Sequence, residues 1–119
     1  MDPDADEIKI AGIDTQLGLK RTGGKWERYV SLLRKFASQQ TAAVTTIQVA
    51  LSVGDTATAE RTAHSLKGSA STLGALALAE AAAEAEAALK TGDGVDAALK
   101  SLANSLDAVV KAVGAKFSG

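Results

Sequence analysis

The sequence predicts an all-α protein, an antiparallel four-helix bundle with a short additional N-terminal helix. Apolar residues make up 46% of the 119 residues but aromatic residues only 3%. This alanine-rich mixture favours helices over the Val-, Ile-, Tyr- and Phe-rich strands of a β-sandwich. Apolar residues also recur at alternating steps of four and three, and glycines divide the chain into segments of helical length.

The first stretch, MDPDADE, is acidic, holds the only proline and has no apolar periodicity. Residues 1–9 are therefore expected to form a flexible acidic lead-in. A short helix is predicted over residues 14–21, because Asp14 is a good N-cap and Gly23-Gly24 ends the segment.

No glycine or proline interrupts residues 25–53, which predicts one long helix. Its predicted core stripe alternates steps of four and three and consists of Trp26, Val30, Leu33, Ala37, Gln40, Val44, Ile47 and Leu51. Gln40 is the one polar member of this stripe.

Three further helices are predicted, over residues 56–73, 75–90 and from 95 onward, with Asp55 as a cap and Gly74 and Gly92 at the breaks. The seams share the same four-three spacing and comprise Ala59, Ala63, Leu66, Ala70 and Leu73 in one helix and Val95, Leu99, Leu102, Leu106, Val109 and Val113 in the last. Short loops between long helices favour antiparallel packing, so residues 10–117 are expected to form one bundle domain.

Composition excludes several classes of function. Thirteen Lys and Arg against fourteen Asp and Glu give a net charge of -1, so no basic surface is expected for nucleic acid or an anionic membrane. The absence of cysteine excludes disulfides, cysteine zinc sites and thiol catalysis, and a single histidine excludes a multi-histidine metal cluster. No apolar run approaches the ~20 residues of a membrane span, and no signal peptide is recognised, so a cytoplasmic location is expected.

The single histidine, His64, follows the seam residue Ala63 and therefore lies about 100° round the helix from the core stripe. Its neighbours on that face are Glu60, Arg61, Lys67, Gly68 and Ser71. A buried structural histidine would be expected among Leu and Ala instead. The alternative is an idle surface histidine.

Two residues favour a functional histidine. Gly68 stands one turn beyond His64 inside a helix, where glycine costs roughly 1 kcal/mol relative to alanine. In so alanine-rich a helix this indicates a need for open space beside the imidazole. Lys67 places an ammonium group within reach of an anionic adduct such as a phosphoryl group, although lysine is also common on any solvated helix face.

If the helix after the turn at Gly74 runs antiparallel to the histidine helix, its residues 83–86 lie level with His64. Either Glu84 or Glu86 could then accept a hydrogen bond from the imidazole Nδ1–H, leaving Nε2 free as a nucleophile. The alternative is an unpaired surface glutamate.

The run AHSLKGSASTLG, residues 63–74, closely resembles the signature of the histidine-containing phosphotransfer (HPt) domain. The core of that signature is His-x-Leu-Lys-Gly, followed after five residues by another Gly. The resemblance extends over most of the chain: residues 14–24 and 29–36 are similar to the first and second helices of the family, and Gly54-Asp55 to its turn before the histidine helix.

This resemblance implies a phosphorelay carrier of the kind found in hybrid sensor histidine kinases, without independent kinase activity. His64 would be the phosphoacceptor and Lys67 would stabilise the phosphoryl charge. Glu86 corresponds to a glutamate that orients the histidine in chemotaxis-kinase phosphotransfer domains. Gly68, Ser71 and Arg61 would serve access and docking.

The implied partners are response-regulator receiver domains, and a hybrid sensor kinase in cis or in trans. The receiver would supply the aspartate and Mg²⁺, and the chain itself would need no cofactor or metal. Two alternatives stay open: a structural or adapter bundle with an incidental histidine, and an enzyme with His64 as general base. The enzyme would need a second titrating group and a pocket that excludes water.

Overall fold

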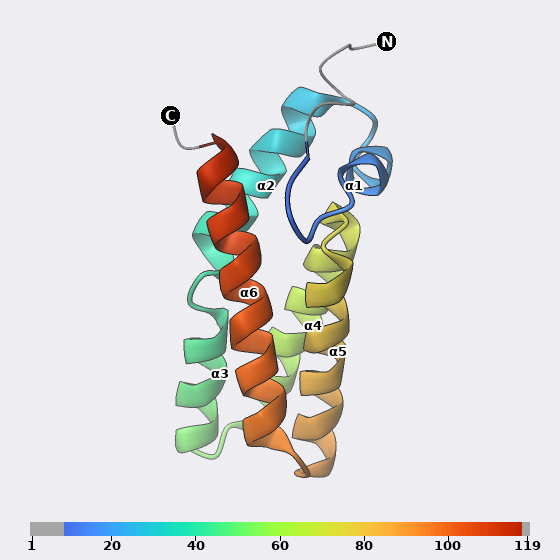
Figure 1. Cartoon of the computed structure of the whole chain (residues 1–119). Helices are drawn as coiled ribbons and strands as arrows, with labels where there is room; N and C mark the ends of the chain where they lie inside the picture. Colours follow the sequence, from blue (N-terminus) through green and yellow to red (C-terminus); the bar gives the residue numbers. More distant parts are fainter. Residues whose placement is uncertain (1–8, 118–119) are drawn as a thin grey trace.

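The computed structural model describes residues 9–117 and, over that range, is built from helices with no strand (Figure 1). In chain order these are α1 (Thr15–Arg21), α2 (Trp26–Gln40), α3 (Ala43–Ser52), α4 (Thr56–Leu73), α5 (Leu76–Thr91) and α6 (Val95–Phe117). The predicted all-α class is confirmed. The expected flexible lead-in lies outside the described residues, except for Lys9, so it stays a prediction.

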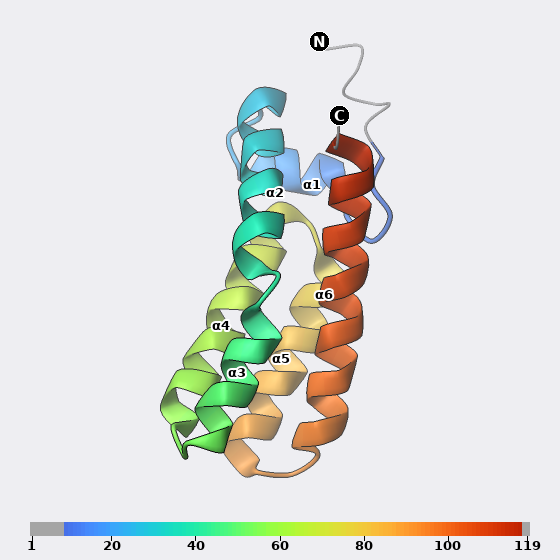
Figure 2. The ribbon, with the colours of Figure 1, turned by 90° about the vertical axis from the view of Figure 1, so that its left-hand side faces the viewer.

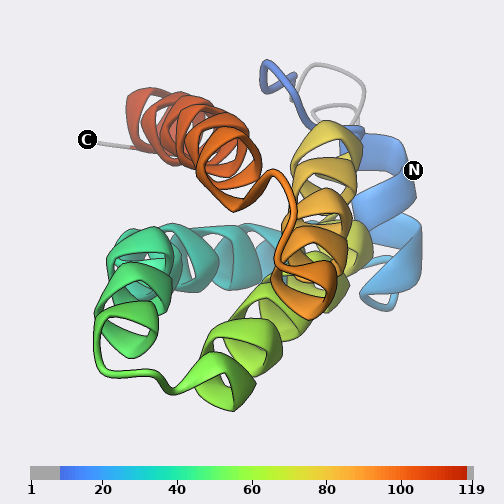
Figure 3. The same cartoon turned by 90° about the horizontal axis from the view of Figure 1, so that it is seen from below.

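The helices form an antiparallel four-helix bundle, as predicted. One pillar consists of α2 and α3 placed end to end, and the other three are α4, α5 and α6 (Figures 1 and 3). The short helix α1 lies across the upper end of the bundle (Figure 2). Asp14 caps it by accepting a hydrogen bond from the Leu17 N–H at 3.0 Å, and the Asp14 N–H donates to the Gly74 carbonyl at 2.8 Å. These bonds tie α1 to the turn between α4 and α5.

The prediction of one uninterrupted helix over residues 25–53 is wrong. Helix α2 ends at Gln40 and α3 begins at Ala43; the backbone of Thr41 is still helical and that of Ala42 is not, so the pillar is divided into two helices. Gln40 is half-buried at a core-facing position, and it lies immediately before the break. An amide that was fully buried there would need hydrogen-bond partners, and ending α2 at this residue leaves the side chain partly exposed.

The predicted core stripe of this pillar is also displaced by one residue in both α2 and α3, except at Leu33 and Ile47, which are buried as predicted. The buried residues are Tyr29, Leu33 and Phe36 in α2, and Ala43, Ile47 and Ala50 in α3. These positions keep the four-three spacing but place the large Tyr and Phe rings inward, where they bury more apolar area than the predicted Val30 and Ala37. Those two side chains are only half-buried.

Helices α4, α5 and α6 agree with their predicted bounds to within two residues at the ends. Asp55 caps α4 by accepting from the Thr58 N–H at 3.1 Å, and Gly74 ends it in the left-handed conformation. The buried residues of α4 are those of the predicted seam, and α5 buries three alanines, two leucines and Glu86. Because alanine is small, the backbones of α4 and α5 can approach closely, which brings side chains at the edges of both helices within bonding distance.

Candidate functional site

The register of α4 exposes His64. Its seam neighbours Ala63 and Leu66 are completely buried, whereas 65% of the His64 side chain is accessible. The predicted placement off the core face is therefore present in the structure. An imidazole in this position can contact a second macromolecule without any movement of the bundle.

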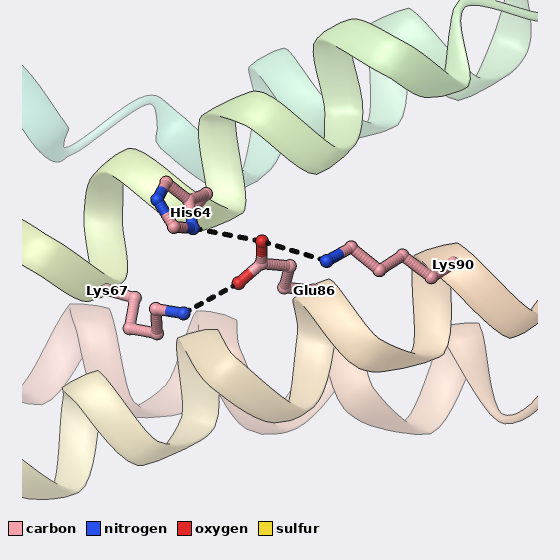
Figure 4. Close-up of polar contacts among 4 residues, drawn as sticks. All are labelled: His64, Lys67, Glu86 and Lys90. Carbon is pink, nitrogen blue, oxygen red and sulfur yellow. Dashed lines mark hydrogen bonds and ion pairs between the residues drawn. The ribbon is translucent and has the colours of Figure 1, made fainter.

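Glu86 of α5 contacts the inner side of the imidazole (Figure 4). Its carboxylate Oε2 lies 3.0 Å from His64 Nδ1, and the residue is only 8% exposed. An ionised carboxylate can only accept hydrogen bonds, so this contact requires a proton on Nδ1. In a neutral ring the lone pair is then on Nε2, on the side away from Glu86. The other candidate, Glu84, is exposed.

Two lysines complete a cluster around Glu86 (Figure 4). Lys67 Nζ donates to Oε1 at 2.9 Å, and Lys90 Nζ lies 3.5 Å from Oε2. The hydrogen bond from Lys67 is the largest cause that lowers the pKa of Glu86 below its usual range; His64, Lys67 and Lys90 also lower it through charge, while burial acts in the opposite direction. Glu86 is thereby held as an anion, the form that fixes the imidazole.

Open space adjoins His64 on the other side of α4. A Cβ atom added to Gly68 would meet no atom within 4 Å. A groove of about 610 Å³ runs between α2 and α4 past this glycine. It is lined by Leu32, Lys35, Phe36, Gln39, Gln40, His64, Ser65, Gly68, Ser69, Thr72 and Leu73. The groove places His64 beside a partly apolar surface that a protein partner could cover.

The remaining predicted residues lie outside this cluster. The carbonyl and the Oγ of Ser71 both accept hydrogen bonds from Arg21 of α1, at 2.6 and 3.2 Å. Arg61 is exposed, and its charge acts on Asp55, the cap of α4. The structure thus brings together His64, Lys67 and Glu86, with Gly68 beside them, and separates Ser71 and Arg61 from them.

Sequence reasoning missed Lys90 and the α2 wall of the groove. The signal for Lys90 was present, since a lysine four residues after a glutamate pairs with it on a helix. The α2 wall, by contrast, depends on the corrected core register, which turns Leu32 and Lys35 toward α4.

Within residues 9–117, no group of three or more His, Cys, Asp or Glu side chains is arranged to hold a metal ion. None of the helices in this range has both the length and the apolar character needed to cross a membrane.

The fold and the site define an all-α bundle that presents one exposed histidine, held by a glutamate, beside an open groove. The Hpt domain family model matches residues 31–115, so the chain belongs to the Hpt domain family. The fold is also similar to the crystal structure of the HPt domain from a Shewanella hybrid sensor histidine kinase, with a TM-score of 0.76 and 25% sequence identity over 90% of this chain and 94% of that one. A comparison with curated proteins found no significant match. Family and fold together support a general role in histidine phosphotransfer.

Proposed function

We propose that this chain is a phosphorelay carrier that accepts a phosphoryl group on His64 from the aspartyl phosphate of a receiver domain and passes it to another receiver aspartate. The observation that carries the proposal is the contact between Glu86 and Nδ1 of the exposed His64, from which the tautomer follows. Glu86 binds the Nδ1–H at 3.0 Å, so the Nε2 lone pair is available on the exposed side of the ring.

Atoms and charges balance in the phosphoryl transfer, and no proton has to leave the site. The Nε2 lone pair forms a bond to phosphorus as the bond from phosphorus to the aspartate oxygen breaks, and the aspartate leaves as a carboxylate with that electron pair. The imidazole ring becomes positively charged and keeps its Nδ1–H, which continues to donate to Glu86. Reversal of these steps delivers the group to a second receiver.

Each neighbour of His64 has a part in this step. Glu86 faces the ring that gains positive charge, and its own negative charge favours that state. Lys67, one turn from His64, supplies a cation for the phosphoryl oxygens. Phosphoryl transfer depends mainly on positioning and charge stabilisation, so the Mg²⁺ expected in the receiver can provide the rest.

The groove beside Gly68 is the proposed docking surface for the receiver. Its apolar floor of Leu32, Phe36 and Leu73 is bordered by polar side chains, the composition of a transient protein interface. The open side of α4 lets a receiver bring its aspartyl phosphate in line with Nε2. A hybrid sensor kinase, in cis or in trans, is the expected source of that receiver.

A panel of phosphorylated receiver domains tests the proposal. We expect at least one to transfer radiolabelled phosphate to the wild-type chain, giving an adduct that is labile in acid and stable in base, as a phosphorus–nitrogen bond is. His64→Gln should take no label and should keep its free energy of unfolding within about 0.5 kcal/mol, because exposed substitutions are usually mild. Base lability would indicate an acyl phosphate on a carboxylate instead. No transfer from any receiver would favour a structural adapter.

A further inference from the structure

Lys90 has no part in the function proposed above, yet it contacts the same oxygen as His64. It lies one turn beyond Glu86 on α5, with Nζ 3.5 Å from Oε2. The two lysines of the cluster differ in exposure, since 61% of the Lys90 side chain is accessible and 36% of Lys67. In the free protein, Lys67 therefore makes the shorter contact with the Glu86 carboxylate, and Lys90 makes the longer one.

Phosphorylation would give Lys67 a second anion to bind. Nδ1 faces Glu86, so a phosphoryl group on Nε2 lies on the side of the ring away from the carboxylate. Lys67 therefore has to turn away from Oε1 to reach it. A phosphoryl group carries more negative charge than a carboxylate and offers three strong acceptor oxygens, which favours that turn.

This movement would free Oε1 of Glu86 from its lysine, while Oε2 keeps its contact with the Nδ1–H of the ring. The carboxylate is almost fully buried, and a buried charge that loses one of its charged partners is destabilised. Lys90 is close enough to replace Lys67: its 3.5 Å contact exceeds a good charge-assisted hydrogen bond of about 2.8 Å by less than an ångström. Its exposed chain is free to make that small adjustment.

We propose, resting on the function above, that Lys90 is a positioning residue that takes over Glu86 when Lys67 turns to the phosphoryl group. Glu86 then stays ionised and aligned, and it continues to accept from the Nδ1–H of the phosphorylated ring. In the phosphorylated state Lys67 then binds the phosphoryl group and Lys90 binds Glu86, whereas in the free state both lysines lie beside Glu86.

The test compares the free and phosphorylated states of single variants. Phosphoramidate, a small phosphoryl donor, labels His64 without a receiver, and nitrogen-15 in the histidine ring gives one Nδ1–H signal because the chain has one histidine. The variants are Lys90→Met, Lys90→Arg and, as matched control, Lys111→Met. Lys111 pairs with Asp107 at 2.9 Å in the same i to i+4 arrangement, on α6.

In the free protein, we expect the Nδ1–H of every variant to exchange with water at the wild-type rate, because Lys67 holds Glu86. After phosphorylation, Lys90→Met should exchange about tenfold faster, as expected for the loss of a charged hydrogen-bond partner. Lys90→Arg and Lys111→Met should stay within about twofold of wild type, since a cation at position 90 or an exposed pair elsewhere changes little.

Three results would overturn the proposal: wild-type exchange in phosphorylated Lys90→Met, equal exchange in Lys90→Arg and Lys90→Met, or faster exchange of Lys90→Met already in the free protein. The last would mean that Lys90 holds Glu86 in both states. Failure of the proposed function gives a different result, in which wild-type His64 takes label from phosphoramidate but from no receiver. If His64 takes no label from either donor, both proposals are wrong.

Discussion

The middle of α4, around His64 and Gly68, is open on its outer side, whereas the backbone carbonyls at its carboxyl end accept hydrogen bonds from α1, from its cap Asp14 and from α2. The last carbonyls of a helix lack partners within the helix. Here Arg21 donates to the Ser71 carbonyl at 2.6 Å, the Tyr29 hydroxyl to that of Leu73 at 2.7 Å, and the Asp14 N–H to that of Gly74 at 2.8 Å. One end of the helix is thus locked while its middle stays accessible.

Gly18 in α1 and Gly68 in α4 differ in the same way, one being closely packed and the other open. A Cβ on Gly18 would clash with the Leu73 carbonyl and the Tyr29 ring, so this glycine allows α1 to approach the end of α4. Gly68 has no such neighbour. Packing therefore explains the first glycine and not the second, for which we propose a role in access to His64.

The largest expected effect is at Gly18. Gly18→Ala should lower the free energy of unfolding by about 3 kcal/mol, because the added methyl forces apart a backbone carbonyl and a buried ring. Gly68→Ala is the matched control and should raise it by up to about 1 kcal/mol, since alanine is the better helix former. Urea denaturation of both variants checks this. Equal effects of the two substitutions would show that the contrast between open and closed regions is false.

The next effect concerns Tyr29, the only tyrosine in the chain. Burial, with the nearby charge of Asp14, raises the pKa of Tyr29 to about 12. Because the folded pKa exceeds the ordinary value of 10.0, the stability it reflects is fully present below pH 10 and is lost as pH rises toward 12. Tyrosinate absorbance should therefore appear only near pH 12 or on unfolding.

Tyr29→Phe should remove this alkaline transition and cost about 1–3 kcal/mol at neutral pH, because the Leu73 carbonyl loses its hydroxyl donor. A tyrosine that titrates near pH 10 in the folded protein would contradict the enclosed end of α4.

The smallest effect is at Glu86. The cations around it lower its pKa, so its contribution to stability is present above the usual carboxyl range near 4.5 and is lost as pH falls through the lowered value. As the pH falls below about 4.5, the melting temperature of Glu86→Gln should therefore decrease less than that of the wild type, which thermal melts at a series of pH values measure. Glu80→Gln, on the exposed side of α5, should keep the wild-type acid slope. An unchanged slope in Glu86→Gln would mean that the lysines do not hold the carboxylate.

Most of the fold was predictable because local signals agree with the packing. Asp14, Asp55, Gly74 and Gly92 mark helix ends by their own chemistry, and the predicted seam of α4 and all of that of α6 except Val95 are buried. The break after Gln40 has no such signal, since neither glycine nor proline is present. In α2, two stripes of apolar residues one position apart have the same helical spacing. Tyr29 and Phe36 belong to the buried one, and packing against the other helices is what selects it.

The centre of the candidate site was predictable for a related reason. Helical spacing places Lys67 and Gly68 beside His64, and the antiparallel return of α5 places Glu86 opposite. Lys90 and the groove depend on side-chain conformations and on the corrected rotation of α2, which spacing within one helix does not determine.

The most direct test of the open site compares two phosphoryl donors on Gly68→Gln. The variant should be as stable as wild type or up to about 1 kcal/mol more stable. Phosphoramidate, being small, should label its His64 at the wild-type rate, whereas transfer from a phosphorylated receiver should fall at least about tenfold, because the added side chain stands where the receiver must approach, a misplacement of the kind that costs large factors in rate. Wild-type transfer from the receiver would contradict the account, because the docking surface would then lie elsewhere.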